Sequence, residues 1–288
     1  EYSTAWNILG YAYRQNGDYA SAEKSFQKYI QLIPKDPNPY DSYAELLLKM
    51  GRYDDSIVQY RKALEIQPNF VNAHQGIAMA LLYTGKPGEA EKELAEFSRK
   101  ARNDGEKRTA MFARTVVHID SGQTAKALAD VDERYAVAQK NNDVAGMAFD
   151  RGLRGLILVE SGKADAAQKE FDAGFQLVQD STLSQEIKDN AKLAHHYNLS
   201  RVAVAKNDLA GAKKEADEYR RGAAGAKNPF IAKNAHELDG IIALAEKDWN
   251  KAIAELGQAN PQNPQDTYRL CEAYRGKGDR AKAAELCV

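Results

Sequence analysis

Cysteine, long apolar runs and an excess of charge of one sign are scarce or absent in this chain of 288 residues. The two cysteines, Cys271 and Cys287, are too few for a disulfide-rich scaffold and lack the C-x-x-C spacing of metal and redox motifs. The richest apolar stretch, from Gly152 to Val159, is interrupted by Arg154 and is far shorter than the roughly 20 residues that span a bilayer. The sequence therefore excludes a cysteine-stapled scaffold and predicts no insertion into a membrane.

The charges of the chain are balanced. Lysine and arginine number 40 and aspartate and glutamate 41, so the formal net charge is -1. A balanced chain has no overall attraction for nucleic acid or anionic lipid, and we predict no nucleic-acid partner. With 20 glycines, 8 prolines and 43% hydrophobic residues, an ordered, soluble protein is expected. The chain begins at Glu1 without a methionine or a leader, and the sequence favours neither a cytoplasmic nor an extracytoplasmic compartment.

A short turn recurs along the whole chain. The first residues of its eight copies are Gly17, Gly51, Gly85, Gly122, Gly162, Asn207, Lys247 and Gly278. Glycine and asparagine tolerate the left-handed conformation that ends a helix, so each turn is predicted to join two helices. Lys247 is the exception that we expect to be strained there.

Small residues recur at fixed distances from these turns. Five residues after each turn position lie Ala22, Ser56, Ala90, Ala127, Ala167, Ala212, Ala252 and Ala283. Seven residues before it lie Gly10, Ala44, Ala78, Thr115, Gly155, Ser200, Gly240 and Cys271. Two antiparallel helices approach closely only where the facing residues are small, so these positions predict the contact line of each helix pair. Larger residues at neighbouring positions, such as Phe26 and Phe171, would then form the core.

The first two copies of this pattern resemble the tetratricopeptide repeat family. The family pattern W-x2-L-G-x2-Y…A-x3-F…P is matched by Trp6, Leu9, Gly10, Tyr13, Ala22, Phe26 and Pro34. The second copy retains Tyr40, Tyr43, Ala44, Leu47, Gly51, Ser56, Tyr60, Ala63 and Pro68, and a weaker third copy has His74, Ile77, Ala78, Leu81, Gly85 and Ala90. The resemblance implies an all-α fold, a right-handed α-α superhelix, or solenoid, of about eight helix-turn-helix repeats.

The repeats divide into a regular and a divergent part. Residues 1–104 are predicted to hold three regular 34-residue repeats, and residues 105–288 about five longer, divergent repeats continuous with them, the last one truncated. The spacing between turns drifts to 37, 40, 45, 40 and 31 residues, and we expect the additional residues mainly in longer first helices. Thr182 with Gln185 is predicted to cap one of these helices, and Asn228 with Pro229 another.

Three residues depart from the family pattern at positions where it requires a large apolar side chain. These residues are Arg114, Arg154 and Asp239. The chain also stops at Val288, inside the second helix of the last repeat, where no polar cap follows. Because a repeat array needs a polar end to remain soluble, we expect a longer parent protein or an end that packs on another surface.

Motifs of catalysis are not found. The chain has no H-E-x-x-H motif, glycine-rich phosphate loop or G-x-S-x-G elbow, and we predict neither enzymatic activity nor a cofactor. Of the five histidines, His74, His196 and His236 occupy the core position of the family tryptophan, so packing accounts for them better than a metal site. Cys271 and Cys287 fall on the two helices of one predicted hairpin, where either a disulfide in an oxidising compartment or two buried thiols would fit.

The resemblance also implies a partner-binding surface. In this family the second, fifth, ninth and twelfth positions of each repeat point into the concave groove. On this sequence they give a partner-binding groove of Asn7, Tyr11, Arg14, Asn38, Asp41, Glu45, Asn72, Gln75 and Met79. Amide side chains donate and accept hydrogen bonds, which suits an extended peptide backbone, although they could equally solvate an exposed helix face. The clamp for carboxylates known in this family is disfavoured, because Asn7, Asn72 and Gly76 stand where it needs lysine and arginine.

The function that follows is a protein–protein interaction module that binds another protein or a peptide in this groove. A more apolar stretch at Phe112, Val116, Ile119 and Leu156 offers a second surface, suited to an amphipathic helix. Two alternatives are an assembly scaffold that docks or self-associates through its terminal repeats, and a receptor for a small molecule enclosed by the superhelix.

Overall fold

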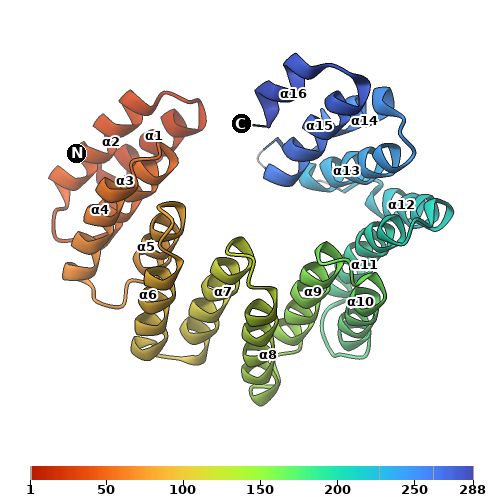
Figure 1. Cartoon of the computed structure of the whole chain (residues 1–288). Coiled ribbons are helices and arrows are strands. Elements are labelled where there is room, and N and C mark those ends of the chain that lie inside the picture. Colours follow the sequence, from red (N-terminus) through yellow and green to blue (C-terminus); the bar gives the residue numbers. More distant parts are fainter. Residues whose placement is uncertain (1, 227, 262, 288) are drawn as a thin grey trace. The chain divides into compact units, whose positions relative to one another are not determined.

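The structure is a computed structural model that describes residues 2–226, 228–261 and 263–287. Within these ranges the chain forms 16 α-helices and no strand (Figure 1). Consecutive helices are joined in pairs by the recurring turns, which confirms the predicted all-α array of helix-turn-helix repeats. Glu1 and Val288, on which the expectations about the two chain ends rest, lie outside the described residues.

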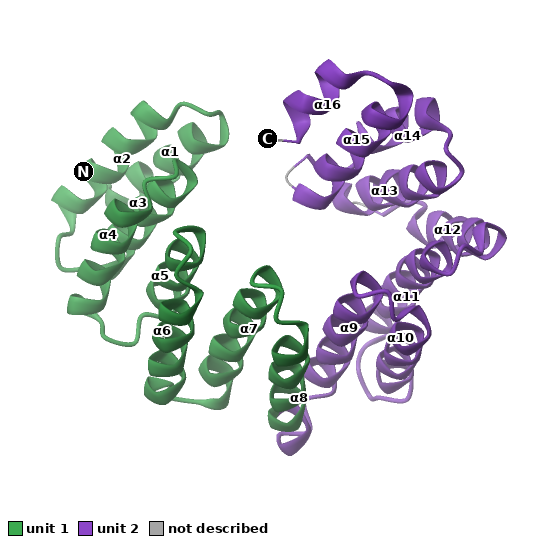
Figure 2. Cartoon of the chain, viewed as in Figure 1, with its two compact units in different colours: residues 1–137 green, residues 138–288 purple. Residues whose placement is uncertain are grey.

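The chain forms two compact units, residues 1–137 and residues 138–288, and the division falls within the eighth helix (Figure 2). The first eight helices are α1 (Ser3–Gln15), α2 (Tyr19–Leu32), α3 (Pro37–Lys49), α4 (Tyr53–Ile66), α5 (Val71–Tyr83), α6 (Pro87–Lys100), α7 (Asp104–Asp120) and α8 (Thr124–Lys140). The remaining helices are α9 (Val144–Glu160), α10 (Ala164–Gln179), α11 (Gln185–Ala205), α12 (Leu209–Ala223), α13 (Pro229–Ala245), α14 (Trp249–Leu256), α15 (Pro264–Lys277) and α16 (Arg280–Leu286). The change of repeat length after residue 104 lies inside the first unit.

All eight predicted turn positions adopt the left-handed backbone conformation. Their φ angles lie between 58° at Asn207 and 90° at Gly278. Lys247 has a φ of 60°, so its backbone is held in the strained conformation that the sequence indicated. Asn142 and Gly225, in the links before α9 and α13, share this conformation, although the repeat pattern did not mark them.

The small residues counted from the turns form the contact line of each helix pair. All eight residues at five positions after the turn, and all eight at seven positions before it, are buried. Where a serine occupies such a position, its hydroxyl group bonds to the facing helix. Ser56 Oγ donates to the carbonyl of Ala44 over 2.8 Å, and Ser200 Oγ donates to the carbonyl of Ala212 over 2.9 Å. A buried hydroxyl group on this contact line therefore finds a hydrogen-bond partner, whether it belongs to the first or to the second helix of the pair.

The longer repeats extend their first helices. Helices α1, α3 and α5 have 13 residues, α7, α9 and α13 have 17, and α11 has 21. Asn228 caps α13 as predicted, because its side chain accepts a hydrogen bond from the amide of Phe230. The prediction that Thr182 caps α11 is wrong. Ser184 accepts from the amide of Ile187 instead, since the helix begins at Gln185 and Thr182 lies in the preceding bend.

The last helix pair contains the disulfide. Cys271 of α15 and Cys287, directly after α16, are bonded to each other, with their Cα atoms 5.8 Å apart. Of the two alternatives left by the sequence, the structure therefore has the bridge. Among the described residues, no helix is long and apolar enough to cross a bilayer.

Candidate partner-binding face of the first three helix pairs

The nine residues assigned to the groove lie on three neighbouring first helices of the first unit. Asn7, Tyr11 and Arg14 belong to α1, Asn38, Asp41 and Glu45 to α3, and Asn72, Gln75 and Met79 to α5. Helix α3 packs against both α1 and α5, as Figure 1 shows for the three ribbons. We call these nine residues the candidate face.

A polar cluster joins α1 to α3 on the candidate face. The hydroxyl oxygen of Tyr11 lies 3.1 Å from Ser42 Oγ and 3.1 Å from Glu45 Oε2. Arg14 Nη1 forms an ion pair with the same Glu45 oxygen at 3.1 Å, and its guanidinium carbon lies 4.7 Å from the centre of the Tyr11 ring. Burial, together with the charge of Glu45, raises the pKa of Tyr11 to about 12, so the phenol remains protonated and able to donate.

Asp41 is the most unusual residue of the candidate face. Its residue surface is 5% exposed, and its Oδ1 has no hydrogen-bond partner among the described residues. Burial is the main cause that raises its pKa to about 7, the charge of Glu45 adds to the rise, and a hydrogen bond from Asn72 opposes it. A buried carboxylate with an unfilled oxygen is costly, so a further hydrogen-bond donor to Asp41 would be favourable.

The remaining residues of the candidate face are less tightly connected. Asn38 is exposed and bonds through its side chain to Asp36 Oδ1 at 2.7 Å, so it belongs to the N-terminal cap of α3 rather than to the cluster. Asn7 is half-buried with an Oδ1 that has no partner among the described residues. Gln75 and Met79 are also half-buried. The structure thus brings Tyr11, Arg14, Asp41, Glu45 and Asn72 together and leaves Asn38 apart.

Two residues beside the cluster were not assigned to the candidate face by sequence reasoning. Ser42 is buried beside Asp41 and reaches the Tyr11 hydroxyl. Tyr60 of α4 is fully buried, with its ring directly above Gly76 of α5, where no side chain intervenes. The charge of Asp41 contributes to a raised pKa of Tyr60, although burial is the larger cause. The signal for Tyr60 was the missing side chain at position 76, which leaves space for a large ring on the facing helix.

The second unit contains a similar cluster in which the chain supplies its own cation. The hydroxyl of Tyr197 donates to Glu237 Oε2 over 2.7 Å. Arg269 Nη1 lies 2.7 Å from Glu237 Oε1 and 3.1 Å from Asp266 Oδ1, so one guanidinium group spans two carboxylates. On the candidate face of the first unit, by contrast, Arg14 reaches Glu45 and leaves Asp41 Oδ1 without a donor.

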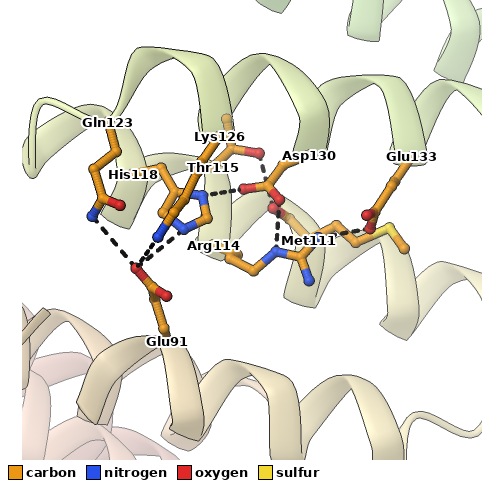
Figure 3. A network of polar contacts seen from close by, with 9 residues as sticks. All are labelled: Glu91, Met111, Arg114, Thr115, His118, Gln123, Lys126, Asp130 and Glu133. Atoms are coloured by element: carbon orange, nitrogen blue, oxygen red, sulfur yellow. Dashed lines mark hydrogen bonds and ion pairs between the residues drawn. The ribbon is translucent and has the colours of Figure 1, made fainter. Parts of the chain in front are cut away.

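A buried charge network explains one departure from the family pattern, as Figure 3 shows. Arg114 Nε lies 2.7 Å from Asp130 Oδ1, and His118 Nδ1 lies 2.6 Å from Asp130 Oδ2. Arg114 also pairs with Glu133 at the exposed end of the network. The arginine therefore replaces an apolar core residue because α8 offers carboxylates opposite it. Arg154 pairs with Glu170 and Asp239 with Arg220 in the same way.

The three histidines at the tryptophan position also have carboxylate partners. The Nδ1 atoms of His74, His196 and His236 lie 2.6, 2.7 and 2.8 Å from glutamates of the following helix. Only His74 is fully buried, so packing alone does not account for the other two. No group of three or more potential metal ligands occurs in the part of the chain that the structure describes.

Comparison with known proteins identifies the repeats. Residues 44–85 match the family described as TPR repeat, and residues 3–36 match the family described as Tetratricopeptide repeat. Anaphase-promoting complex subunit 3 of Schizosaccharomyces pombe is 26% identical over 173 residues, which cover 60% of this chain and 25% of that protein. Superkiller complex protein 3 of Mus musculus is 33% identical over 81 residues, which cover 28% of this chain and 5% of that protein. The chain thus matches a quarter or less of the length of these relatives.

Solved structures share the fold. A tetratricopeptide repeat protein from Parabacteroides merdae superposes with a TM-score of 0.58 at 13% identity, covering 94% of this chain and 98% of that protein. The type IV pilus biogenesis factor PilW superposes with a TM-score of 0.51 at 14% identity, covering 78% of this chain and 95% of that protein. At such identities the likeness shows the arrangement of helices and no shared partner.

Proposed function

Since the chain is a tetratricopeptide repeat protein, a kind of protein-interaction scaffold, we propose that it binds a polypeptide along the candidate face of its first three helix pairs. Proteins of this family are generally non-enzymatic, and the proposal assigns no catalytic step and no cofactor to the chain. The bound segment lies across α1, α3 and α5, where amide, phenol and carboxylate groups alternate with Met79.

The observation that carries the proposal is the unfilled carboxyl oxygen of Asp41. In the second unit, the guanidinium group of Arg269 bridges Glu237 and Asp266. On the candidate face no described side chain donates to Asp41 Oδ1. A partner that brings a donor, such as an arginine, a lysine or a backbone N–H group, removes this deficit and gains a charge-assisted hydrogen bond. The partner segment is therefore expected to carry donors or positive charge.

Selection from a random peptide library tests the proposal while the natural partner is still unidentified. A displayed library of 12-residue peptides is panned against the chain, against Asp41→Asn, and against Asp54→Asn as a control on the exposed start of α4. We expect peptides with a common motif to be enriched by the chain and by the control. Synthetic copies should bind Asp41→Asn at least tenfold more weakly, because the charge-assisted bond is lost.

Two results would count against the candidate face. If no peptide is enriched, peptide binding is not the function. If the selected peptides bind Asp41→Asn as tightly as the parent chain, the binding surface does not include this carboxyl group. A thermal melt of each variant shows that a lost affinity does not arise from unfolding.

A second function, self-association as an assembly scaffold, is favoured by one observation on α1. Ile8 and Leu9 are 65% and 38% exposed on its surface, and Tyr2 is exposed just before it. Apolar groups gathered on one helix are typical of protein contacts. Sedimentation velocity at rising concentration tests this alternative, with Ile8→Glu as the disrupting variant and Val58→Glu, at an exposed position of α4, as its control. A mass that stays monomeric for all three proteins excludes self-association.

A further inference from the structure

The second unit contains an apolar cavity that the candidate face does not use. It lies between α9, α10 and α11, has a volume of about 270 Å³, and is partly open to solvent. Its lining includes Phe149 and Leu156 of α9, Phe171 and Phe175 of α10, and Ala194 of α11. Carbon atoms form most of its surface, so burial of an apolar group is favoured there.

The cavity has room because one side chain of α9 is missing. Counted back from their turns, Gly152 of α9 corresponds to Asp41 of α3. A Cβ placed at Gly152 would meet no heavy atom within 4 Å. Where the candidate face of the first unit has a buried carboxyl group, α9 therefore leaves open space that its neighbours surround with apolar side chains.

The lining carries no charge that a ligand could pair with. Among the described residues that form it, none is an aspartate, glutamate, lysine or arginine, and only His195 and Asn198 have polar side chains. The nitrogen atoms of His195 do not serve the cavity, because Nε2 lies 3.4 Å from Asp172 Oδ1, Nδ1 is buried, and the ring forms a hydrogen bond with the backbone of Phe171. Burial lowers the pKa of His195, so the neutral ring is favoured. A charged ligand would therefore lose its water without gaining a partner.

The volume limits the size of the occupant. An apolar cavity of roughly 150 Å³ accepts one benzene ring, which allows roughly 25 Å³ for each carbon atom. A volume of about 270 Å³ therefore suits about ten carbon atoms, as in two fused aromatic rings. Leucine, methionine and phenylalanine side chains are smaller and would leave part of the space empty. Empty apolar space forfeits van der Waals contacts, so the larger bicyclic group is favoured.

We propose that this cavity binds a small, uncharged aromatic molecule of two fused rings, which is free in solution and not part of a polypeptide. The rings lie over Gly152 and against Leu156 and the phenylalanine rings of the lining. Apolar contact and shape determine the affinity, and no ion pair contributes. The site does not involve Asp41, so it is tested separately from peptide binding by the first unit.

Two probes of equal shape test the requirement for a neutral ligand. 1-Methylnaphthalene and the N-methylquinolinium ion differ in one ring atom and a positive charge. Their binding is measured by chemical shift changes of the α9, α10 and α11 amides. We expect the neutral probe to bind at least about tenfold more tightly, because the lining has no carboxylate for the cation. Equal or tighter binding of the cation would replace the proposed ligand by a cation held among aromatic rings.

A series of probes of increasing size tests the boundary of the cavity. Toluene, 1-methylnaphthalene and 9-methylanthracene add one ring at each step. We expect the second ring to raise the affinity at least about tenfold and the third by less than about threefold, because the third ring stays in water. An equal gain at both steps would show an open apolar surface in place of a bounded cavity.

A variant that fills the cavity locates the binding. Gly152→Leu should abolish binding of 1-methylnaphthalene while the thermal melt stays at or above that of the parent, because its Cβ enters open space. Gly88→Leu is the matched control, since Gly88 also starts a side chain into open space but lies on α6. Unchanged binding in Gly152→Leu, or no binding by the parent chain, would remove the site.

Side chains of a bound polypeptide are the competing occupants. N-acetylphenylalaninamide and N-acetyltryptophanamide represent the two largest apolar candidates. We expect both to bind at least about tenfold more weakly than 1-methylnaphthalene, because the phenyl ring leaves space empty and the indole N–H group must leave water. If either binds as tightly as 1-methylnaphthalene, the cavity receives a side chain of a partner and not a free molecule.

Discussion

Gly155 of α9 lies directly beneath the ring of Phe171 of α10. A Cβ at position 155 would stand 2.5 Å from Cε1 of that ring, closer than real carbon atoms approach. Gly10 with Phe26 and Gly240 with Leu256 repeat this relationship, each glycine at seven positions before a turn and each large residue at nine positions after it. The absence of a side chain is therefore what lets the two helices of these pairs meet.

The two glycines of α9 should consequently respond in opposite ways to the same change. Gly155→Ala forces the Phe171 ring to move and is expected to lower the stability by about 1–3 kcal/mol. Gly152→Ala meets open space and is expected to raise it by up to about 1 kcal/mol, because alanine favours the helix. Urea unfolding of both variants measures the difference. A loss of stability in both would mean that position 152 is filled in solution.

Removal of Asp130 should destabilise the first unit strongly. Asp130→Ala leaves the partly buried Arg114 and the buried His118 without their shared carboxylate, and the expected loss is about 3–5 kcal/mol. Glu133→Ala is the control, because the Glu133 side chain is 55% exposed and its pairing with Arg114 contributes less than about 1 kcal/mol. Equal urea midpoints for the two variants would show that Asp130 is not buried as described.

Asp41 should make the first unit less stable as the pH rises. Its pKa is raised to about 7 by burial and by Glu45, so between the ordinary aspartate pKa of about 4 and pH 7 the folded chain binds more protons than the unfolded chain. The contribution of Asp41 to the free energy of unfolding therefore falls as the pH rises through this window, by at most about 1.4 kcal/mol per pH unit. Asp41→Asn should equal the parent near pH 4 and exceed it at pH 8. Urea midpoints from pH 4 to 8 test this, and parallel curves for the two proteins would contradict it.

Relief of backbone strain should stabilise the turn before α14. Lys247 has a φ of 60°, a backbone conformation that costs a residue with a Cβ roughly 1–2 kcal/mol relative to glycine. A glycine at this position avoids that cost, but part of the gain is lost because glycine makes the unfolded chain more flexible. Lys247→Gly is expected to raise the stability by about 0.5–1 kcal/mol. Asn207→Gly, at a φ of 58°, should gain less because asparagine tolerates this conformation. Thermal melts of both variants show which substitution stabilises the chain more.

Reduction of the disulfide should loosen the last helix pair. Cys271 and Cys287 are 16 residues apart, and closing a loop of this size stabilises a fold by about 3 kcal/mol. With dithiothreitol, the amides of α15 and α16 should lose hydrogen-exchange protection, since α16 has only 7 residues of its own. A double variant, Cys271→Ala with Cys287→Ala, should not respond to the reductant. Labelling of both thiols in the untreated protein would disprove the bridge.

The sequence could predict those parts of the fold that depend on local backbone conformation. The left-handed turns and the small residues on the contact lines follow from the properties of glycine, asparagine and alanine at fixed spacings, and all of them were found in place. The cap of α11 was placed two residues too early, because Thr182 and Ser184 are both suitable caps and only the helix start distinguishes them.

Contacts between side chains on different helices were harder to predict. Arg114 was recognised as a departure from the apolar pattern, but its partner Asp130 depends on how α7 faces α8. Of the candidate face, the sequence placed Tyr11 and Glu45 on neighbouring helices, whereas the burial of Asp41 and the participation of Ser42 require the packed structure. The cavity beside Gly152 likewise arises from a missing side chain, which a search for chemical groups does not detect.

The left-handed turn residues have a consequence for how such a chain can change in length. The small residues on the contact line of each helix pair lie within seven residues of its turn, whether the first helix has 13 residues, as in α1, or 21, as in α11. Residues inserted at the end of a helix far from the turn therefore leave these contacts in register. Insertions next to the turn would rotate one helix by about 100° per residue and separate the small residues. Natural or engineered variation in repeat length should accumulate at the distal ends, where new pockets and surfaces can form while the paired contacts are kept.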